Sequence, residues 1–457
     1  MLRLSKHCHI FTKDANVCLF HATGISPVYF SERQLPLLKL LETACLPETE
    51  IIQRLALELN AATEVVKSLQ EKNFLVASNF NDEEELGLLQ QDYTGTPRIS
   101  VMYLLLSDSC NLSCTYCYIR NLLPKGYNCA TMSEEMAITA IQFFTKQINM
   151  AEENEPTIIF YGGEPLLNFH ALKAATLESK KQITKGNLPE ATQLQIVTNG
   201  TLLTNEIAKF LKQHRISVVI SIDGPTAAHT HSRTNGTQYK HKQILNGLRI
   251  LTRNKLKPGI SCTLNEETLR DFDHLLNWLV NDAGTSGIGF NLIRPIPPFT
   301  ISDDYAKRAS EALILGHETL SRHGIPEDRM QRKVSSFVNG TVYPYDCAGC
   351  GNQIVVAPDG AIGPCAGFLG SRKYFVTNAK DDRFDPKNNA EYLYWSKRSP
   401  LNLPQCRNCP AIAICGGGCP FSAEINQGSL FDLDEIFCVH AKTALQYLIW
   451  KLQKNLR

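Results

Sequence analysis

The feature that most limits how this chain can fold is one short loop with three cysteines, Cys110, Cys114 and Cys117, in C-x3-C-x2-C spacing. An apolar segment at residues 100–106, which is predicted to be a buried strand, leads directly into the loop. Thiolates suit zinc and iron–sulfur centres. Structural zinc sites and electron-transfer clusters normally use four protein ligands. Three cysteines therefore indicate a metal centre with one open coordination position.

Strands and helices alternate from residue 97 to about residue 325. Strands are predicted at residues 100–106, 157–161, 194–197, 218–222, 259–264 and 287–292. Helical periods lie between them, for example at residues 132–147, 205–213, 242–253 and 268–281. This alternation predicts an α/β fold with a parallel sheet and right-handed crossovers. Ligands bind such sheets in the loops after the carboxyl ends of the strands, which is where the cysteine loop falls.

The cysteine loop, with Tyr116 directly before its last cysteine, resembles the C-x3-C-x-aromatic-C signature of the radical S-adenosylmethionine (SAM) superfamily. The resemblance implies a (β/α)6 partial TIM-like barrel over residues 97–325. It also implies a 4Fe–4S cluster whose open iron binds SAM, which the reduced cluster cleaves to a 5′-deoxyadenosyl radical. By itself the loop leaves open a zinc knuckle or cysteines without a metal.

Motifs after the later strands extend this resemblance. Gly-Gly-Glu-Pro follows the second strand, as in the motif that holds the SAM amino group, although a Gly-Gly turn alone is equally typical of a plain loop. An arginine after the fourth strand would pair with the SAM carboxylate. The family often has His-Asp before it; here His229 and His231 precede it and are more typical of solvated surface. The implied SAM-binding residues are Gly162, Gly163, Glu164, Pro165, Thr198, Asn199, Ser221, Asp223 and Arg233.

The C-terminal part is rich in cysteines and resembles the SPASM extension of radical SAM enzymes, here at residues 340–440. That extension carries two auxiliary 4Fe–4S clusters. The resemblance assigns one cluster to Cys347, Cys350, Cys365 and Cys419, and the other to Cys406, Cys409, Cys415 and Cys438. The spacing of the second ligand varies in the family, an open iron bound by substrate stays possible, and zinc ribbons are the alternative. The remaining cysteines are expected in the core or in loops: Cys8, Cys18, Cys45, Cys129 and Cys262.

Residues 1–85 are predicted to form a separate winged-helix-like domain. Strand-like segments at residues 9–11, 17–20 and 27–30 precede helical periods at residues 35–41, 48–59 and 62–72. Three strands and three helices resemble the peptide-recognition element of many ribosomal-peptide maturases, which adds a leader peptide to its sheet edge. The likeness lies in the pattern only, and a structural cap is the alternative. Residues 86–96 are expected to be a linker, although a solvated helix face is equally possible for the acidic stretch at residues 79–91. Residues 441–457 are expected to be a closing helix.

Charge and composition limit the partners. The chain has 457 residues and a formal net charge of +1, so no strong field favours nucleic acid or an anionic membrane. No apolar run is long enough to span a bilayer, and the start of the chain does not resemble a signal peptide. We therefore expect a cytoplasmic protein. Sixteen cysteines in such a chain are more typical of metal ligands than of disulfides.

Together these patterns predict a radical SAM/SPASM enzyme that modifies a ribosomal peptide or protein, with a thioether or carbon–carbon crosslink as product. The expected partners are the precursor and reduced flavodoxin or ferredoxin, and no catalytic residue is predicted beyond the SAM cluster. One alternative is a sulfatase-maturase-like enzyme that oxidises Cys or Ser to formylglycine. Those enzymes often have Asp where this chain has Ala366. A non-catalytic iron–sulfur carrier or regulator is a further alternative, but it would need no SAM pocket.

Overall fold

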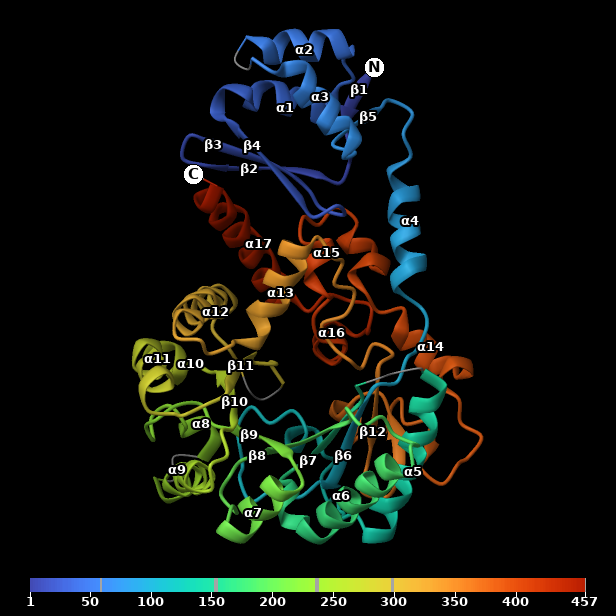
Figure 1. Ribbon diagram of the computed structural model, residues 1–457, viewed down its shortest axis with the longest axis vertical. Helices are drawn as coiled ribbons and strands as arrows, with labels where there is room; N and C mark the ends of the chain where they lie inside the picture. The colour runs from blue at the N-terminus through green and yellow to red at the C-terminus, as the bar shows by residue number, and fades with distance from the viewer. Residues whose placement is uncertain (58–59, 152–154, 235–237, 297–299, 457) are drawn as a thin grey trace.

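The computed structural model describes residues 1–457 except 58–59, 152–154, 235–237, 297–299 and 457. Its centre is a curved sheet with the strand order β11-β10-β9-β8-β7-β6-β12-β13-β14 (Figure 1). Neighbouring strands from β6 to β11 are parallel. The prediction of a mostly parallel α/β sheet is confirmed by β6 (Val101–Ser107), β7 (Thr157–Gly162), β8 (Gln193–Thr198), β9 (Ile216–Ser221), β10 (Gly259–Leu264) and β11 (Gly287–Leu292).

Helices cover the outer face of this sheet. In β9, Ile216, Val218 and Ile220 are buried against the helices, whereas Val219 and Ser221 are half-buried on the inner face. This alternation with period two is what a sheet needs to present one face to a core and the other to a cavity. The helices are α5 (Glu134–Ala151), α6 (Phe169–Thr184), α7 (Asn205–Gln213), α8 (His231–Thr234), α9 (Gln238–Arg253), α10 (Glu266–Arg270), α11 (Phe272–Asn281) and α12 (Tyr305–Arg322).

The cysteine-rich segment continues the sheet. β12 (Gln353–Val356) pairs in parallel with β6, and β13 (Ala361–Gly363) and β14 (Thr377–Asn378) follow as antiparallel strands. This segment is therefore anchored on the first barrel strand. The helices around it are α13 (Asp328–Asn339), α14 (Ala390–Ser396), α15 (Ile412–Cys415), α16 (Pro420–Gln427) and α17 (Glu435–Leu456). Short 3-10 turns are η1 (Glu32–Gln34), η2 (Arg120–Leu122), η3 (Pro165–Asn168), η4 (Ala366–Phe368), η5 (Pro386–Asn388), η6 (Pro400–Asn402) and η7 (Pro404–Cys406).

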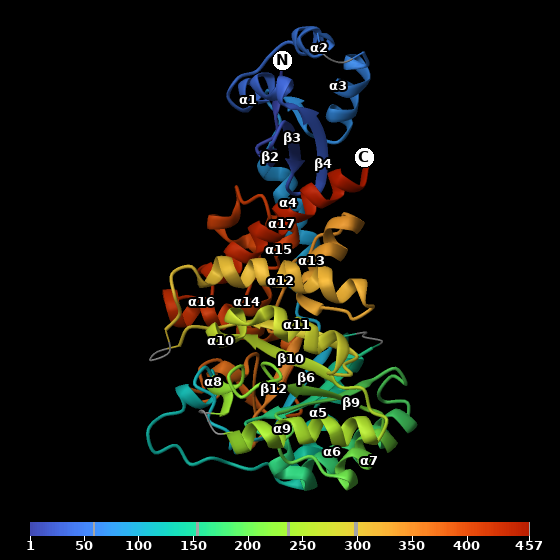
Figure 2. The same cartoon turned by 90° about the vertical axis from the view of Figure 1, so that its left-hand side faces the viewer.

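The N-terminal part forms a second body at one end of the elongated molecule (Figure 1, Figure 2). Its antiparallel sheet has the order β2-β3-β4, and a separate pair joins β1 to β5. Its elements are β1 (Leu2–Leu4), β2 (Cys8–Lys13), β3 (Asn16–His21), β4 (Ser26–Ser31), α1 (Leu35–Thr43), α2 (Glu48–Ala56), α3 (Ala62–Glu71) and β5 (Leu75–Ala77). The end of the helix predicted at residues 48–59 falls on residues 58–59, outside the described residues.

Two helices join the N-terminal part to the rest of the molecule. Helix α4 (Asp82–Tyr93) runs from it toward the barrel and takes up most of the predicted linker (Figure 1). The end of α17 packs on its sheet, where the Tyr29 hydroxyl donates to the Ile449 carbonyl at 2.5 Å. The Phe20 and Phe337 rings stack 6.2 Å apart. Among the helices described, none is both long and apolar enough to cross a membrane.

Candidate functional site

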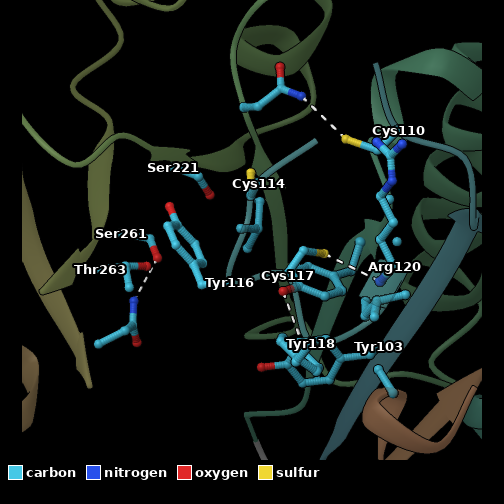
Figure 3. Close-up of a pocket in the computed structure, with 18 of the residues that line it drawn as sticks. Tyr103, Cys110, Cys114, Tyr116, Cys117, Tyr118, Arg120, Ser221, Ser261 and Thr263 are labelled. Carbon is cyan, nitrogen blue, oxygen red and sulfur yellow. Dashed lines mark hydrogen bonds between the residues drawn. The ribbon is translucent and has the colours of Figure 1, made fainter. Parts of the chain in front are cut away.

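A cavity of about 1180 Å³ lies along the inner face of the curved sheet. Its walls come from β6–β12, from the loops after the barrel strands and from the cysteine-rich segment. Figure 3 shows Cys110, Cys114 and Cys117 on one side of it, and Ser221, Ser261 and Thr263 on another. The cavity thus lies where the sequence predicts a ligand, and it reaches further down the strands.

The three cysteines of the first loop all line this cavity. The Leu112 amide donates to the Cys110 sulfur and the Arg120 amide to the Cys117 sulfur, each at 3.4 Å. Such N–H donors favour a thiolate over a thiol. Burial acts the other way and is the largest cause that raises the pKa of Cys114 to about 12. A bound metal ion overcomes such a rise, because a coordinating thiol is deprotonated. The donor set therefore fits a thiolate-bound metal centre.

Two glycines after β7 allow the backbone to approach the start of the cysteine loop. A Cβ at Gly162 would lie 2.2 Å from the Ser107 carbonyl oxygen, and one at Gly163 would lie 2.1 Å from that of Ser109. In this close contact the Gly163 amide donates to the Ser107 carbonyl at 2.8 Å. Both glycines also line the cavity. They therefore hold the cysteine loop in place as well as offering backbone to a ligand.

Glu164 lies behind the cavity wall. Its buried carboxylate accepts hydrogen bonds from the Thr198 hydroxyl at 2.7 Å and from the Asn199 amide at 2.8 Å. Burial raises the pKa of Glu164, and these donors oppose the rise. Neither Glu164 nor Pro165 lines the cavity, whereas Thr198 and Asn199 do. Glu164 thus fixes the position of the Thr198–Asn199 loop, a role that the motif alone does not reveal.

Asp223 is fully buried and holds Arg233 at the cavity wall. Its carboxylate accepts from Arg233 Nη2 at 2.8 Å and Nε at 3.2 Å, from the Thr263 amide at 3.0 Å and from the Tyr116 hydroxyl. The guanidinium also lies 5.6 Å from the centre of the Tyr116 ring. Arg233 and Ser221 line the cavity, and Asp223 does not. The structure therefore gives Asp223 contacts to the protein where the sequence predicted contacts to SAM.

The two histidines before Arg233 differ in exposure. His231 is exposed, as expected. His229 is buried, and its Nδ1 lies 2.6 Å from the Thr226 hydroxyl. The expectation of a solvated His229 is therefore wrong, because the loop after β9 folds back onto the start of α11. There His229 Nε2 lies 3.2 Å from the Asp271 carbonyl oxygen.

The eight tail cysteines gather in two groups. Cys347, Cys365 and Cys419 line the cavity, with buried Cys350 behind them. The pKa of Cys350 is raised by burial and then by its neighbours Cys347 and Cys419. In the second group, the pKa of Cys438 is raised by burial and then by Cys415, Cys406 and Cys409. The two groups have the same members as the two sets of ligands that the sequence predicts.

The spacing of the thiols is wider than a zinc site requires. Four sulfurs around zinc, at Zn–S distances of about 2.3 Å, lie roughly 3.8 Å apart. In the part of the chain that the structure describes, no three cysteine sulfurs lie within 4.8 Å of one another. Among the described residues, the only group of possible metal ligands whose atoms lie within 4.8 Å of one another is His229, Asp271 and His274. There His274 Nδ1 lies 3.1 Å from an Asp271 carboxylate oxygen.

Sequence reasoning missed an arginine and several tyrosines of the cavity. Arg294 Cζ lies 4.8 Å from the centre of the Tyr118 ring, and the Tyr118 and Tyr161 hydroxyls are 3.3 Å apart. They line the cavity between the first cysteine loop and Cys365 and Cys419. The position of Arg294 just after the sixth predicted strand was the available signal, because loops at that edge bind ligands.

Comparison with known proteins identifies the central part of the chain. Residues 104–279 match the family model described as the radical SAM superfamily. This stretch of the chain is therefore similar to the radical SAM superfamily. The chain is 26% identical, over 100% of its own length and 97% of the relative's, to a radical SAM cyclopropyl synthase from Paramaledivibacter caminithermalis. A cysteine-type anaerobic sulfatase-maturating enzyme from Clostridium perfringens is 25% identical and matches 78% of this chain and 98% of its own.

Solved structures share the fold. Native anSMEcpe with bound AdoMet superposes with a TM-score of 0.65 at 20% identity, over 78% of this chain and 98% of its own. Streptococcus suis SuiB bound to the precursor peptide SuiA gives a TM-score of 0.55 at 14% identity, over 96% and 100% of the two chains. The SuiB match thus includes most of the N-terminal part, and the partial-barrel fold predicted from the sequence is confirmed.

Proposed function

We propose that this protein is a radical SAM/SPASM maturase that modifies a peptide or protein made by the ribosome. The main support is the cavity, because it joins the first cysteine loop and the group of Cys347, Cys365 and Cys419 in one space. A drug-sized ligand fills roughly 300–1,000 Å³. A cavity of about 1180 Å³ therefore has room for SAM and part of a second molecule between the two cysteine groups.

The residues around the first loop fit SAM and its cluster. Cys110, Cys114 and Cys117 would hold the 4Fe–4S cluster, which with bound SAM supplies a 5′-deoxyadenosyl radical able to remove a hydrogen atom from an unreactive carbon. Arg233 uses Nε and Nη2 to bind Asp223, which leaves its Nη1 donors for the SAM carboxylate. The backbone of Gly162 and Gly163 and the side chains of Thr198, Asn199 and Ser221 complete this wall.

The tail cysteines are proposed to bind two auxiliary 4Fe–4S clusters. Their gathering in two groups supports this assignment. Three cubane clusters amount to ~12 iron atoms per chain. Replacing Cys110, Cys114 and Cys117 by Ala should leave roughly two thirds of that iron, since the tail sites are untouched. Zinc in the tail, with iron for a single cluster in the wild type, would refute the auxiliary clusters.

The substrate is proposed to be a precursor peptide whose leader binds the N-terminal domain. The sulfatase-maturating relative matches only 78% of this chain, whereas the cyclopropyl synthase matches all of it. That full-length likeness favours carbon–carbon bond formation over a thioether. Ala366, which lines the cavity, stands where sulfatase maturases often have Asp and does not support formylglycine formation. Reduced flavodoxin or ferredoxin is the proposed electron donor.

Anaerobic incubation with SAM, reductant and a short peptide encoded beside the gene tests this proposal. We expect 5′-deoxyadenosine and a mass change in the peptide. Both should disappear when Cys110, Cys114 and Cys117 are replaced by Ala. Cys129→Ala is the matched control, because Cys129 also lines the cavity but is exposed and lies outside the proposed ligand set. SAM cleavage at the wild-type rate in the triple variant would rule out the radical assignment.

A further inference from the structure

The cavity is lined unevenly. Tyr103 on β6 and Tyr161 on β7 stand in the middle of the curved sheet, with their rings in edge contact 5.5 Å apart. The strands at the β11 edge carry several small groups, and Figure 3 shows Ser261 and Thr263 well apart from Tyr103. Six of the residues of β10 and β11 that line the cavity are small or polar and pair across the two strands as Gly259 with Gly287, Ser261 with Gly289, and Thr263 with Asn291; Ile260, Ile288 and Leu292 line it as well. Small side chains therefore leave space in the cavity beside β11.

Gly289 differs from the neighbouring glycines because the fold does not require it. A Cβ at Gly289 would have no atom within 4 Å, and its φ is not in the left-handed region. By contrast, a Cβ at Gly287 would lie 3.1 Å from Pro326, and one at Gly316 would lie 2.8 Å from the Phe290 ring. Glycine inside a strand weakens the strand, and it often marks a place where a ligand approaches. The space at Gly289 is therefore available to a ligand.

The surroundings of this space are neutral. Asn291 donates its amide to the Ser261 hydroxyl at 2.9 Å, so the two polar groups beside Gly289 satisfy each other. The charged groups that line the cavity, within the described chain, already have partners. Arg233 binds Asp223, Arg120 donates to the Leu112 carbonyl, Asp108 accepts from Tyr127, Asp328 pairs with Arg332, and Arg294 lies over the Tyr118 ring. A side chain placed beside Gly289 would meet the neutral Ser261–Asn291 pair, so burying an ionised group there would be costly.

We propose that the space bounded by Gly289, Ser261 and Asn291 is the slot that receives the side chain of the peptide residue to be modified, and that this side chain is uncharged. The proposal rests on the proposed function and specifies which wall selects the substrate. A larger residue at 289 would occupy the slot without disturbing the backbone. The size of that residue should then set which peptides react.

The test uses the full-length, cluster-loaded protein with the Gly289→Ala and Gly289→Leu variants. The measured quantity is modified peptide per 5′-deoxyadenosine formed, with the precursor peptide encoded beside the gene as the probe. We expect Gly289→Ala to lower this ratio about tenfold, as for one misfitting methylene. Gly289→Leu should lower it about 10²-fold, because the reacting carbon is displaced. Gly87→Leu is the matched control, since its Cβ also has no neighbour within 4 Å and it lies outside the cavity in α4.

A size-complementation step separates a slot from a structural effect. A precursor with the modified residue shortened to Ala should bind Gly289→Leu with nearly the affinity that the native peptide shows for the wild type. If Gly289→Leu modifies the native peptide as well as the wild type does, the slot is wrong and the proposed function stands. If Gly289→Leu no longer binds SAM, the space belongs to SAM and the slot is again wrong. If the wild type forms 5′-deoxyadenosine but leaves the peptide unmodified, the proposed function fails and the slot fails with it.

Discussion

The buried carboxylate of Asp223 connects two loops that are far apart in the sequence. It accepts hydrogen bonds from Tyr116 in the cysteine loop and from Arg233 after β9. A buried charge is costly unless a partner and further donors satisfy it, and the Thr263 amide supplies one more donor. Asp223 therefore sets the position of both Arg233 and the cysteine loop without contacting the cavity.

Asp223→Asn should weaken SAM binding by at least about tenfold. The amide keeps the shape but leaves the Arg233 guanidinium buried without a counter-charge, a loss that costs about 3–5 kcal/mol in comparable buried pairs. Calorimetric titration of the anaerobic protein with SAM measures the affinity, and thermal unfolding measures the stability. Asp359→Asn is the control, because its ion pair with Arg372 is on the surface and such pairs contribute about 0–1 kcal/mol. Unchanged SAM affinity in Asp223→Asn would contradict the positioning role.

At this scale the sequence predicted which loops form the site but not where each side chain points. Contact of Asp223 and Glu164 with SAM stays a prediction, and the structure adds that each binds protein groups behind the wall. Tyr116, which binds Asp223, lies 107 residues away in the chain, and Thr198, which binds Glu164, lies 34 residues away. Nothing in a local motif indicates these two pairings. Arg294 was missed for the same reason, because its significance depends on Tyr118 and the tail cysteines.

At the scale of the elements, the contact between the loops after β6 and β7 holds the cysteine loop in place. The Glu164 amide donates to the Ser109 carbonyl at 2.9 Å, directly before the first cysteine. A Cβ at Gly162 would lie 2.2 Å from the Ser107 carbonyl oxygen, so this position has no room for a side chain. The loop that carries the cysteines is thus held by the backbone of a second loop, and its shape should depend on the absence of a side chain there.

Gly163→Ala should therefore remove the cluster of the first cysteine loop, which is one of the three proposed clusters. The iron content should fall by ~4 atoms per chain, and SAM cleavage should be abolished. The added Cβ would lie 2.1 Å from the Ser109 carbonyl oxygen and 2.4 Å from its carbon, so the start of the cysteine loop must move. Iron is measured without SAM present, which separates loss of the cluster from loss of a SAM contact. Gly87→Ala serves as the control. Full iron content in Gly163→Ala would show that the loop tolerates the shift.

The sequence predicted the barrel strands within about two residues, because period-two patterns are local. Two features of the elements lay beyond such patterns. The parallel pairing of β12 with β6 joins segments some 250 residues apart and has no local signal. The helix predicted at residues 268–281 is divided into α10 and α11 at Asp271, whose backbone leaves the helical region. Helix α4 replaces most of the linker, since its acidic first turn suits a helix N-terminus.

At the scale of the whole molecule, the N-terminal part packs against the rest of the protein in addition to being joined to it by the chain. Phe20 stacks on Phe337, Tyr29 binds the end of α17, and the first turn of α4 is held by the pair of Arg3 and Asp82 at 2.6 Å. Asp82 also accepts from the Lys6 amide. The boundary of this unit therefore lies inside α4, beyond the acidic residues. A truncation must remove Asp82 with the unit and leave the rest of α4 in place, because Gln90 in α4 donates to the Leu401 carbonyl of the cysteine-rich segment.

Removing residues 1–86 should separate substrate affinity from radical chemistry. If the N-terminal domain binds the leader, the variant that begins at Gly87 should still cleave SAM slowly. Its apparent KM for the precursor should rise by about 10²-fold, the advantage that linkage of two binding sites provides. Adding the isolated domain in trans should restore activity only in part.

Soluble expression and intact iron content must be checked first, because the cut exposes buried Phe337 and the side of α17 that Tyr29 covers. A Phe337→Ser exchange in the truncated chain reduces that apolar surface and serves as the matched control for aggregation. A folded, cluster-loaded variant that modifies the precursor as well as the full chain would show that the domain is a structural cap. The likeness to peptide maturases would then rest on the barrel and the tail alone, where the sulfatase-maturating relatives match equally.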